Sequence, residues 1–176
     1  PADYRLPALA ELDGARSFAD VRMGWNESGI GVSIEVKERS CPLRASTSNP
    51  ADSDGLHIWL NTRNSQRIHR ATKYCQQFSI LPCGGGSKGK EPVVAVVPLA
   101  RSRESATLVD PSSILVRSEI RKDGYQLEVW LPAEVMTGFD PSQHSRIGFH
   151  YVVRDSELGD QSLVVDQEFP RDSDPS

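Results

Sequence analysis

Aromatic and polar side chains alternate with apolar ones along three short segments, Leu56–Asn61, Tyr125–Leu131 and Ile147–Arg154. In an extended chain, successive side chains point to opposite sides, so the apolar positions define a core side. The opposite side then carries a mixed set of aromatic, amide and charged residues, namely His57, Trp59, Asn61, Gln126, Glu128, Trp130, His150 and Arg154. We expect these residues to form one sheet face that binds a ligand.

A surface of this composition suits a sugar. The apolar C–H face of a pyranose ring stacks on an indole, and its hydroxyls are bound by planar donors and acceptors such as Arg, Gln, Asn, Glu and His. The alternative is that the long loops cover Trp59 and Trp130, because Trp is usually largely buried. The domain would then be a structural or protein-interaction module with no small ligand.

Two turns are rich in carboxylates. One contains Asp155, Glu157 and Asp160, and the other reads DSDG at Asp52–Gly55. Calcium takes about six to eight oxygen ligands, so Asp155, Glu157 and Asp160 are candidate calcium ligands. Neither turn has the spacing of an EF-hand loop, and an ordinary Asx-type turn is the alternative for each. Calcium is the cofactor that these turns indicate, and no cofactor is taken as certain.

The motifs that would indicate an enzyme are incomplete or missing. Gly84–Lys90 matches most of a phosphate-binding loop, but Glu91 stands where a Ser or Thr would bind magnesium. The residues that follow favour a strand, so no helix N-terminus would face a phosphate. The sequence has no Gly-x-Ser-x-Gly motif, and its 4 His are dispersed. We therefore predict a non-catalytic domain.

Composition excludes several classes of protein. The net charge is −4 with no basic stripe for nucleic acid, and the most basic run, Arg63–Lys73, is interpreted as a solvated loop. No segment is apolar over the length of a membrane span. The 3 Cys are expected to be free thiols, with a Cys75–Cys83 bridge as the alternative. No signal peptide is visible and the chain begins at Pro1, so we expect a processed or trimmed piece, with its oligomeric state left open.

Short alternating segments separated by polar turns predict an all-β fold. The predicted strands are Gly29–Val36, Leu56–Asn61, Tyr74–Leu81, Pro92–Leu99, Ile114–Arg121, Tyr125–Leu131, Ile147–Val153 and Ser162–Val165. No long helical pattern alternates with them, which favours a two-sheet antiparallel β-sandwich. One short helix is expected near 132–138, between Pro132 and Gly138. We expect an N-terminal extension at 1–17, the sandwich domain at 18–168 and an acidic C-terminal tail at 169–176.

A series of segments, in order, resembles a known family. They are a Trp-containing hairpin at Trp25–Val36 (WNESGIGVSIEV), an Asp-led strand at Asp54–Asn61 (DGLHIWLN), a Gly-Tyr strand with a Glu at Gly124–Pro132 (GYQLEVWLP), and a strand that ends in an Asp turn at Ile147–Asp155. Together, over roughly Phe18 to Val165, they resemble the family 9 carbohydrate-binding modules and their relatives in the DOMON superfamily.

The resemblance implies a two-sheet sandwich, sugar binding by aromatic side chains, often calcium, frequent attachment to glycoside hydrolases and a secreted or periplasmic location. Glu128 occupies the Glu position of the Gly-Tyr motif. Some DOMON relatives bind haem through an axial Met and His, for which Met23 and His150 are the candidate pair. Haem binding is thus a further alternative. The loops Glu38–Gly55 and Asn61–Tyr74 and the segment Cys75–Glu91 depart from the short family pattern.

Overall fold

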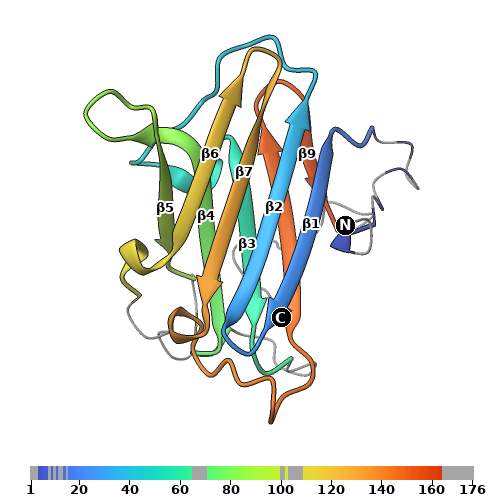
Figure 1. Cartoon of the computed structure of the whole chain (residues 1–176), viewed down its shortest axis with the longest axis vertical. Coiled ribbons are helices and arrows are strands. Elements are labelled where there is room, and N and C mark those ends of the chain that lie inside the picture. The colour runs from blue at the N-terminus through green and yellow to red at the C-terminus, as the bar shows by residue number, and fades with distance from the viewer. Residues whose placement is uncertain are drawn as a thin grey trace.

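The structure, a computed structural model, describes residues 4–7, 9, 11, 14, 16–64, 71–99, 102 and 109–163. These residues form two antiparallel sheets that pack face to face (Figure 1). The four-stranded sheet has the order β1-β2-β7-β6, with β1 at Ala19–Asn26, β2 at Gly29–Lys37, β6 at Leu115–Arg121 and β7 at Gly124–Pro132. The five-stranded sheet has the order β5-β4-β3-β8-β9, with β3 at Gly55–Asn61, β4 at Cys75–Gly85, β5 at Glu91–Val97, β8 at Gly148–Asp155 and β9 at Gly159–Ser162. The predicted two-sheet antiparallel β-sandwich is confirmed.

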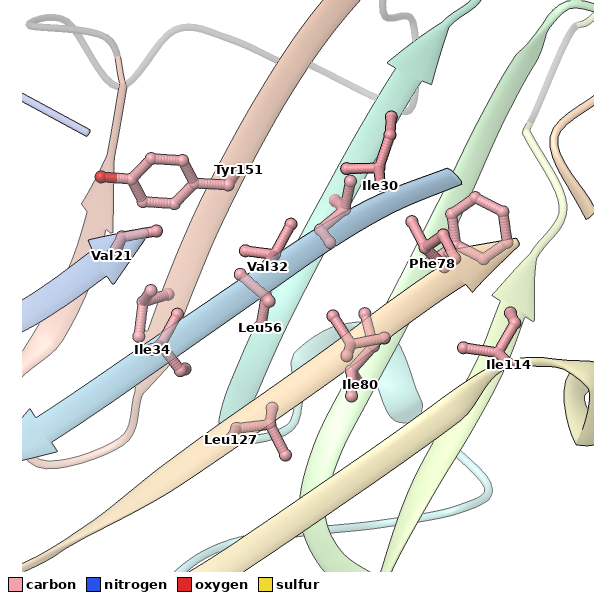
Figure 2. Close-up of a cluster of buried hydrophobic side chains, with 14 of the residues drawn as sticks. Val21, Ile30, Val32, Ile34, Leu56, Phe78, Ile80, Ile114, Leu127 and Tyr151 are labelled. Atoms are coloured by element: carbon pink, nitrogen blue, oxygen red, sulfur yellow. The ribbon is translucent and has the colours of Figure 1, made fainter. Parts of the chain in front are cut away.

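The hydrophobic core fills the space between the two sheets (Figure 2). The four-stranded sheet contributes Val21, Ile30, Val32, Ile34 and Leu127, and the five-stranded sheet contributes Leu56, Ile58, Phe78, Ile80 and Tyr151. A shift of register by one residue would turn every one of these side chains away from the core, so the core fixes the register. It therefore also fixes which side chains point outward from each sheet.

Several local elements differ from the sequence prediction. The helix expected near 132–138 is a single 3-10 turn, η5 (Ala133–Val135), because β7 extends to Pro132 and keeps its extended backbone there. Two further 3-10 turns are η3 (Pro50–Asp52) and η4 (Pro111–Ser113). The glycine-rich stretch at Gly84–Lys90 ends β4 and turns directly into β5. The last described strand is β9, which begins before the predicted Ser162–Val165 because a tight turn follows β8.

The described part of the N-terminal extension is attached to the sandwich. The backbone N–H of Leu6 donates to the carbonyl oxygen of Val21 at 2.8 Å. The side chain of Gln161 on β9 accepts from the N–H groups of Phe18 and Ala19 at 2.8 and 2.9 Å, which links an edge of each sheet. The domain boundaries stay predictions, and the acidic tail at 169–176 lies outside the described residues, as do 65–70 of the basic run.

Cys41, Cys75 and Cys83 are free thiols in the structure. Among the described residues, no helix combines the length and the apolar character needed to cross a membrane.

Candidate functional site

The predicted binding residues lie on two opposite faces of the sandwich. Gln126, Glu128 and Trp130 point outward from β7 in the four-stranded sheet. The remaining residues point outward from β3 and β8 in the five-stranded sheet: His57, Trp59, Asn61, His150 and Arg154. The whole hydrophobic core lies between these two groups. The prediction of a single face is therefore wrong, because alternation assigns each residue a side of its strand but does not assign each strand to a sheet.

His57, on the outer side of the five-stranded sheet, is a buried structural residue with 1% of its surface exposed. Its Nδ1 lies 2.9 Å from Ser79 Oγ, and its Nε2 lies 3.0 Å from the carbonyl oxygen of Ser53. Burial lowers the pKa of His57 to about 4, so the ring is neutral at pH 7. Since a carbonyl only accepts, Nε2 carries the proton and Nδ1 accepts from the Ser79 hydroxyl. His57 therefore joins the loop before β3 to β4.

Trp59 and His150 pack against each other on the same covered side. Their ring centroids are 5.6 Å apart, and 9% of Trp59 and 6% of His150 are exposed. Burial lowers the pKa of His150 to about 4. The buried Trp59 Nε1 has no hydrogen-bond partner among the described residues. Asn61 is also buried and its side-chain oxygen accepts from the N–H of Arg63. The structure thus encloses this group rather than presenting it to a ligand.

The predicted calcium ligands have separate protein partners. Asp160 pairs with Arg154 at 3.0 Å, and Asp155 pairs with Arg39 at 2.7 Å. Glu157 accepts from the Ser40 hydroxyl and from two backbone N–H groups, which lowers the pKa of Glu157 to about 2. The described residues contain no group of three or more metal-binding side chains. Calcium binding stays a prediction, and these carboxylates as arranged do not fit it.

A buried arginine supplies the positive charge that this oxygen-rich region needs. Arg39 Nη1 lies 3.1 Å from Asp54 Oδ2 and 2.7 Å from Asp155 Oδ2. Its Nη2 lies 3.4 and 3.3 Å from the carbonyl oxygens of Cys41 and Pro42. Carboxylates and carbonyls converging in this way attract a cation, and here the Arg39 guanidinium provides the positive charge through hydrogen bonds.

The candidate haem ligands do not share a face. Met23 packs against the core between the sheets, whereas His150 lies on the outer side of the five-stranded sheet, in register with Trp59. The five-stranded sheet therefore separates the two side chains, and they cannot be the axial ligands of one haem.

On the outer side of the four-stranded sheet, the half-buried indole of Trp130 packs over two glycines. A Cβ atom added at Gly31 would lie 3.4 Å from Cε3 of Trp130, and one added at Gly29 would lie 2.9 Å from its Cζ2. The six-membered ring of Trp130 thus runs along β2 over two residues that lack side chains. Glycine in a strand commonly marks such a close approach. The ring therefore packs against the β2 backbone, and Trp130 is half-buried there.

Two exposed side chains flank the half-buried Trp130. Tyr4 lies over Gly24, where an added Cβ would be 3.4 Å from the Tyr4 Cδ1, and 52% of Tyr4 is exposed. Leu115 lies directly opposite Trp130 on β6 and is 65% exposed. We call Tyr4, Trp130 and Leu115 the apolar shelf. The alternation pattern identified only Trp130 of the three, because the shelf depends on strand pairing and on a residue upstream of the sandwich.

A shallow pocket of about 150 Å³ lies beside the shelf and is lined by Arg117, Glu119, Gln126 and Glu128. Gln126 is oriented by Arg121, which donates to its oxygen at 3.1 Å, and its Nε2 donates to Glu128 Oε1 at 3.1 Å. Arg117 lies opposite Glu128 in register and is exposed. The pocket therefore brings two predicted residues together with Arg117 and Glu119, which the sequence reading missed.

The comparisons with known proteins give a likeness of fold. No family model matches the chain, and no curated protein matches it. Two solved structures of a family 9 carbohydrate-binding module from Caldicellulosiruptor kristjanssonii, in complex with cellotriose and with glucose, match it with TM-scores of 0.57 and 0.59. Each is 16% identical and covers 90% of this chain, which matches 70% and 72% of those chains. The chain thus has the fold of a family 9 carbohydrate-binding module, as the sequence motifs predicted.

Proposed function

We propose that this domain is a non-catalytic carbohydrate-binding module whose site is the outer face of the four-stranded sheet. The observation that carries the proposal is Trp130, a half-buried indole that packs over Gly29 and Gly31 beside a polar pocket. The fold supports it, because the two similar structures are carbohydrate-binding modules in complex with cellotriose and with glucose. A secreted or periplasmic location stays a prediction.

The chemistry of the pocket fits the rim of a sugar. A pyranose ring stacked on Trp130 turns its hydroxyls toward the neighbouring polar side chains. Arg117 offers several N–H donors, and Glu128 keeps its second carboxylate oxygen as an acceptor while the first accepts from Gln126. Because Arg121 already orients Gln126, little side-chain entropy is lost when a hydroxyl binds there.

One observation favours a second candidate function, a structural or protein-interaction domain with no small ligand. The outer side of the five-stranded sheet is covered along β3, where every residue is buried, Trp59 included. Trp130, half-buried on the opposite face, supports the first candidate, because the cover over β3 does not extend to it.

The test compares two indoles. Neutral oligosaccharides of glucose, xylose and mannose are titrated into the folded protein by calorimetry, in buffer with and without calcium. We expect Trp130→Ala to weaken the affinity of the ligand that binds by about tenfold or more, a loss of about 1.4 kcal/mol. Trp25→Ala is the matched control, because Trp25 is 60% exposed and lies at the end of β1, with the opposite parity to the shelf.

Two results would count against the proposal. One is that no glycan in the panel binds to the folded wild-type protein. The other is that Trp130→Ala binds as tightly as Trp25→Ala, which would place the ligand elsewhere on the domain.

A further inference from the structure

The apolar shelf runs across the strands rather than along one of them. Gly24, Gly31, Trp130 and Leu115 are in register on β1, β2, β7 and β6, and Tyr4 lies over Gly24 at one end of this row. Neighbouring strands are about 4.8 Å apart, so the row from β1 to β6 is about 14 Å long. One pyranose ring cannot cover that length, whereas a short run of linked rings can.

Both ends of the row are exposed in the part of the chain that the structure describes. Tyr4 at the β1 end is 52% exposed, and Leu115 at the β6 end is 65% exposed. A site that is specific for a chain end has to enclose the terminal hydroxyls. Its own polar groups pair with those hydroxyls, and a longer chain, which lacks a hydroxyl at that position, would leave them unpaired. An open row instead allows a chain to continue past both edges of the sheet.

The charges on this face neutralise one another. Arg22 pairs with Asp20 at 3.0 Å, and Lys37 pairs with Glu35 at 3.2 Å. Arg121 lies between Glu35 and Glu119, at 3.0 and 3.1 Å. A polyanionic glycan would meet carboxylates as often as cations, so the face offers it no net attraction.

We infer that the shelf binds the interior of an extended, uncharged polysaccharide chain that lies across the strands and contacts Tyr4, Trp130 and Leu115 in turn. The inference rests on the proposed function and names its substrate class. It also predicts that affinity grows with the number of sugar units until the row is filled.

The experiment is a length series on the whole domain. Oligosaccharides of one to six units, built from the sugar that binds in the panel and starting with glucose to cellohexaose, are titrated by calorimetry. We expect the four-unit oligosaccharide to bind about tenfold or more tightly than the monosaccharide, because each added ring gains a shelf contact. Its methyl glycoside, in which the reducing end is blocked, is expected to bind equally well.

The flanking residues supply the matched variants. Tyr4→Ala and Leu115→Ala are each expected to weaken binding of the four-unit oligosaccharide by about fivefold, while Ile120→Ala leaves it unchanged. Ile120 is the control because it is also exposed and apolar, at 50%, but has the opposite parity on β6. Thermal unfolding shows that each variant is folded.

The outcomes separate this inference from the proposed function. If a monosaccharide binds as tightly as the longer chains, if the methyl glycoside fails to bind, or if Tyr4→Ala and Leu115→Ala have no effect, the shelf does not bind a chain interior although the domain still binds sugar. If polygalacturonate binds more tightly than the neutral series, the ligand is charged. If no glycan binds at all, both proposals are overturned.

Discussion

Arg39 gives the most direct test of what stabilises the loops at one end of the sandwich. Its side chain is 3% exposed and lies between two carboxylates, those of Asp54 and Asp155, whose side chains are 1% and 0% exposed. The substitution Arg39→Met keeps most of the volume and removes the charge. It leaves two carboxylates in a buried place without their cation.

The size of the effect follows from the partners that remain. Removing one partner from a buried ion pair costs about 3–5 kcal/mol. Asp54 still accepts from the N–H groups of Arg44 and Ser156, and Asp155 still accepts from those of Glu157 and Leu158. These hydrogen bonds continue to stabilise both buried carboxylates, so we expect a loss near the lower end, about 3 kcal/mol. That is a large share of the roughly 5–15 kcal/mol by which a domain is stable.

The assay is urea unfolding followed by Trp fluorescence, with Arg121→Met as the matched control. Arg121 also lies between two carboxylates, those of Glu35 and Glu119, but its side chain is 41% exposed. Exposed pairs contribute about 0–1 kcal/mol, so the control should be nearly as stable as the wild type. Arg39→Lys, which keeps the charge, should recover part of the loss. Equal stabilities of Arg39→Met and Arg121→Met would refute the reasoning.

Two further predictions concern stability. The pKa of His57 falls from 6.5 to about 4 on folding, so protonation of His57 favours the unfolded state, and its contribution to the free energy of unfolding should fall by about 3 kcal/mol as the pH falls from about 6.5 to about 4. His57→Gln should show a smaller fall in urea titrations across this range, and an identical pH dependence of both proteins would contradict the assignment. In the second, a Cβ atom at Gly124 would lie 2.0 Å from the carbonyl oxygen of Val36, so Gly124→Ala should lower the midpoint of thermal unfolding well below that of Gly89→Ala. At Gly89 an added Cβ meets nothing within 4 Å, so the substitution adds only the backbone strain of a residue at φ +63°, about 1 kcal/mol. Equal unfolding midpoints for the two variants would show that the β2–β7 pair tolerates the contact at Gly124.

Alternation predicted the two sides of each strand reliably. Leu56, Ile58 and Leu60 point into the core, and His57 and Trp59 point away from it, as the sequence indicated. What alternation could not give was the partner of each strand. β7 pairs with β2, roughly ninety residues earlier in the chain, and this pairing depends on contacts far apart in sequence. The sequence therefore predicted correctly which side of its strand each residue lies on, but wrongly placed all of them on one face of the domain.

The residues missed by sequence reasoning share one cause. Leu115 and Arg117 lie on β6, an edge strand whose outer side mixes apolar and charged residues, so no clear pattern set them apart. Tyr4 lies outside any alternating segment. Its ring packs over Gly24 on the outer face of the four-stranded sheet, where a side chain at position 24 would crowd it. A signal was nevertheless present in the outward glycines of β2, Gly29 and Gly31, since a strand glycine often marks the close approach of another group.

The two outward indoles show why an aromatic residue on a sheet does not by itself indicate a binding site. Trp59 faces Gln77 on one neighbouring strand and His150 on the other, its ring contacts that of His150, and it is buried. Trp130 faces Gly31 on β2 and Leu115 on the edge strand β6. A glycine partner lets an indole pack against the strand backbone, because no side chain stands between them. A bulky partner holds the indole among side chains, where it adds to packing. In an outward-facing strand pair, a glycine opposite a Trp is therefore a stronger indication of a ligand platform than the Trp alone.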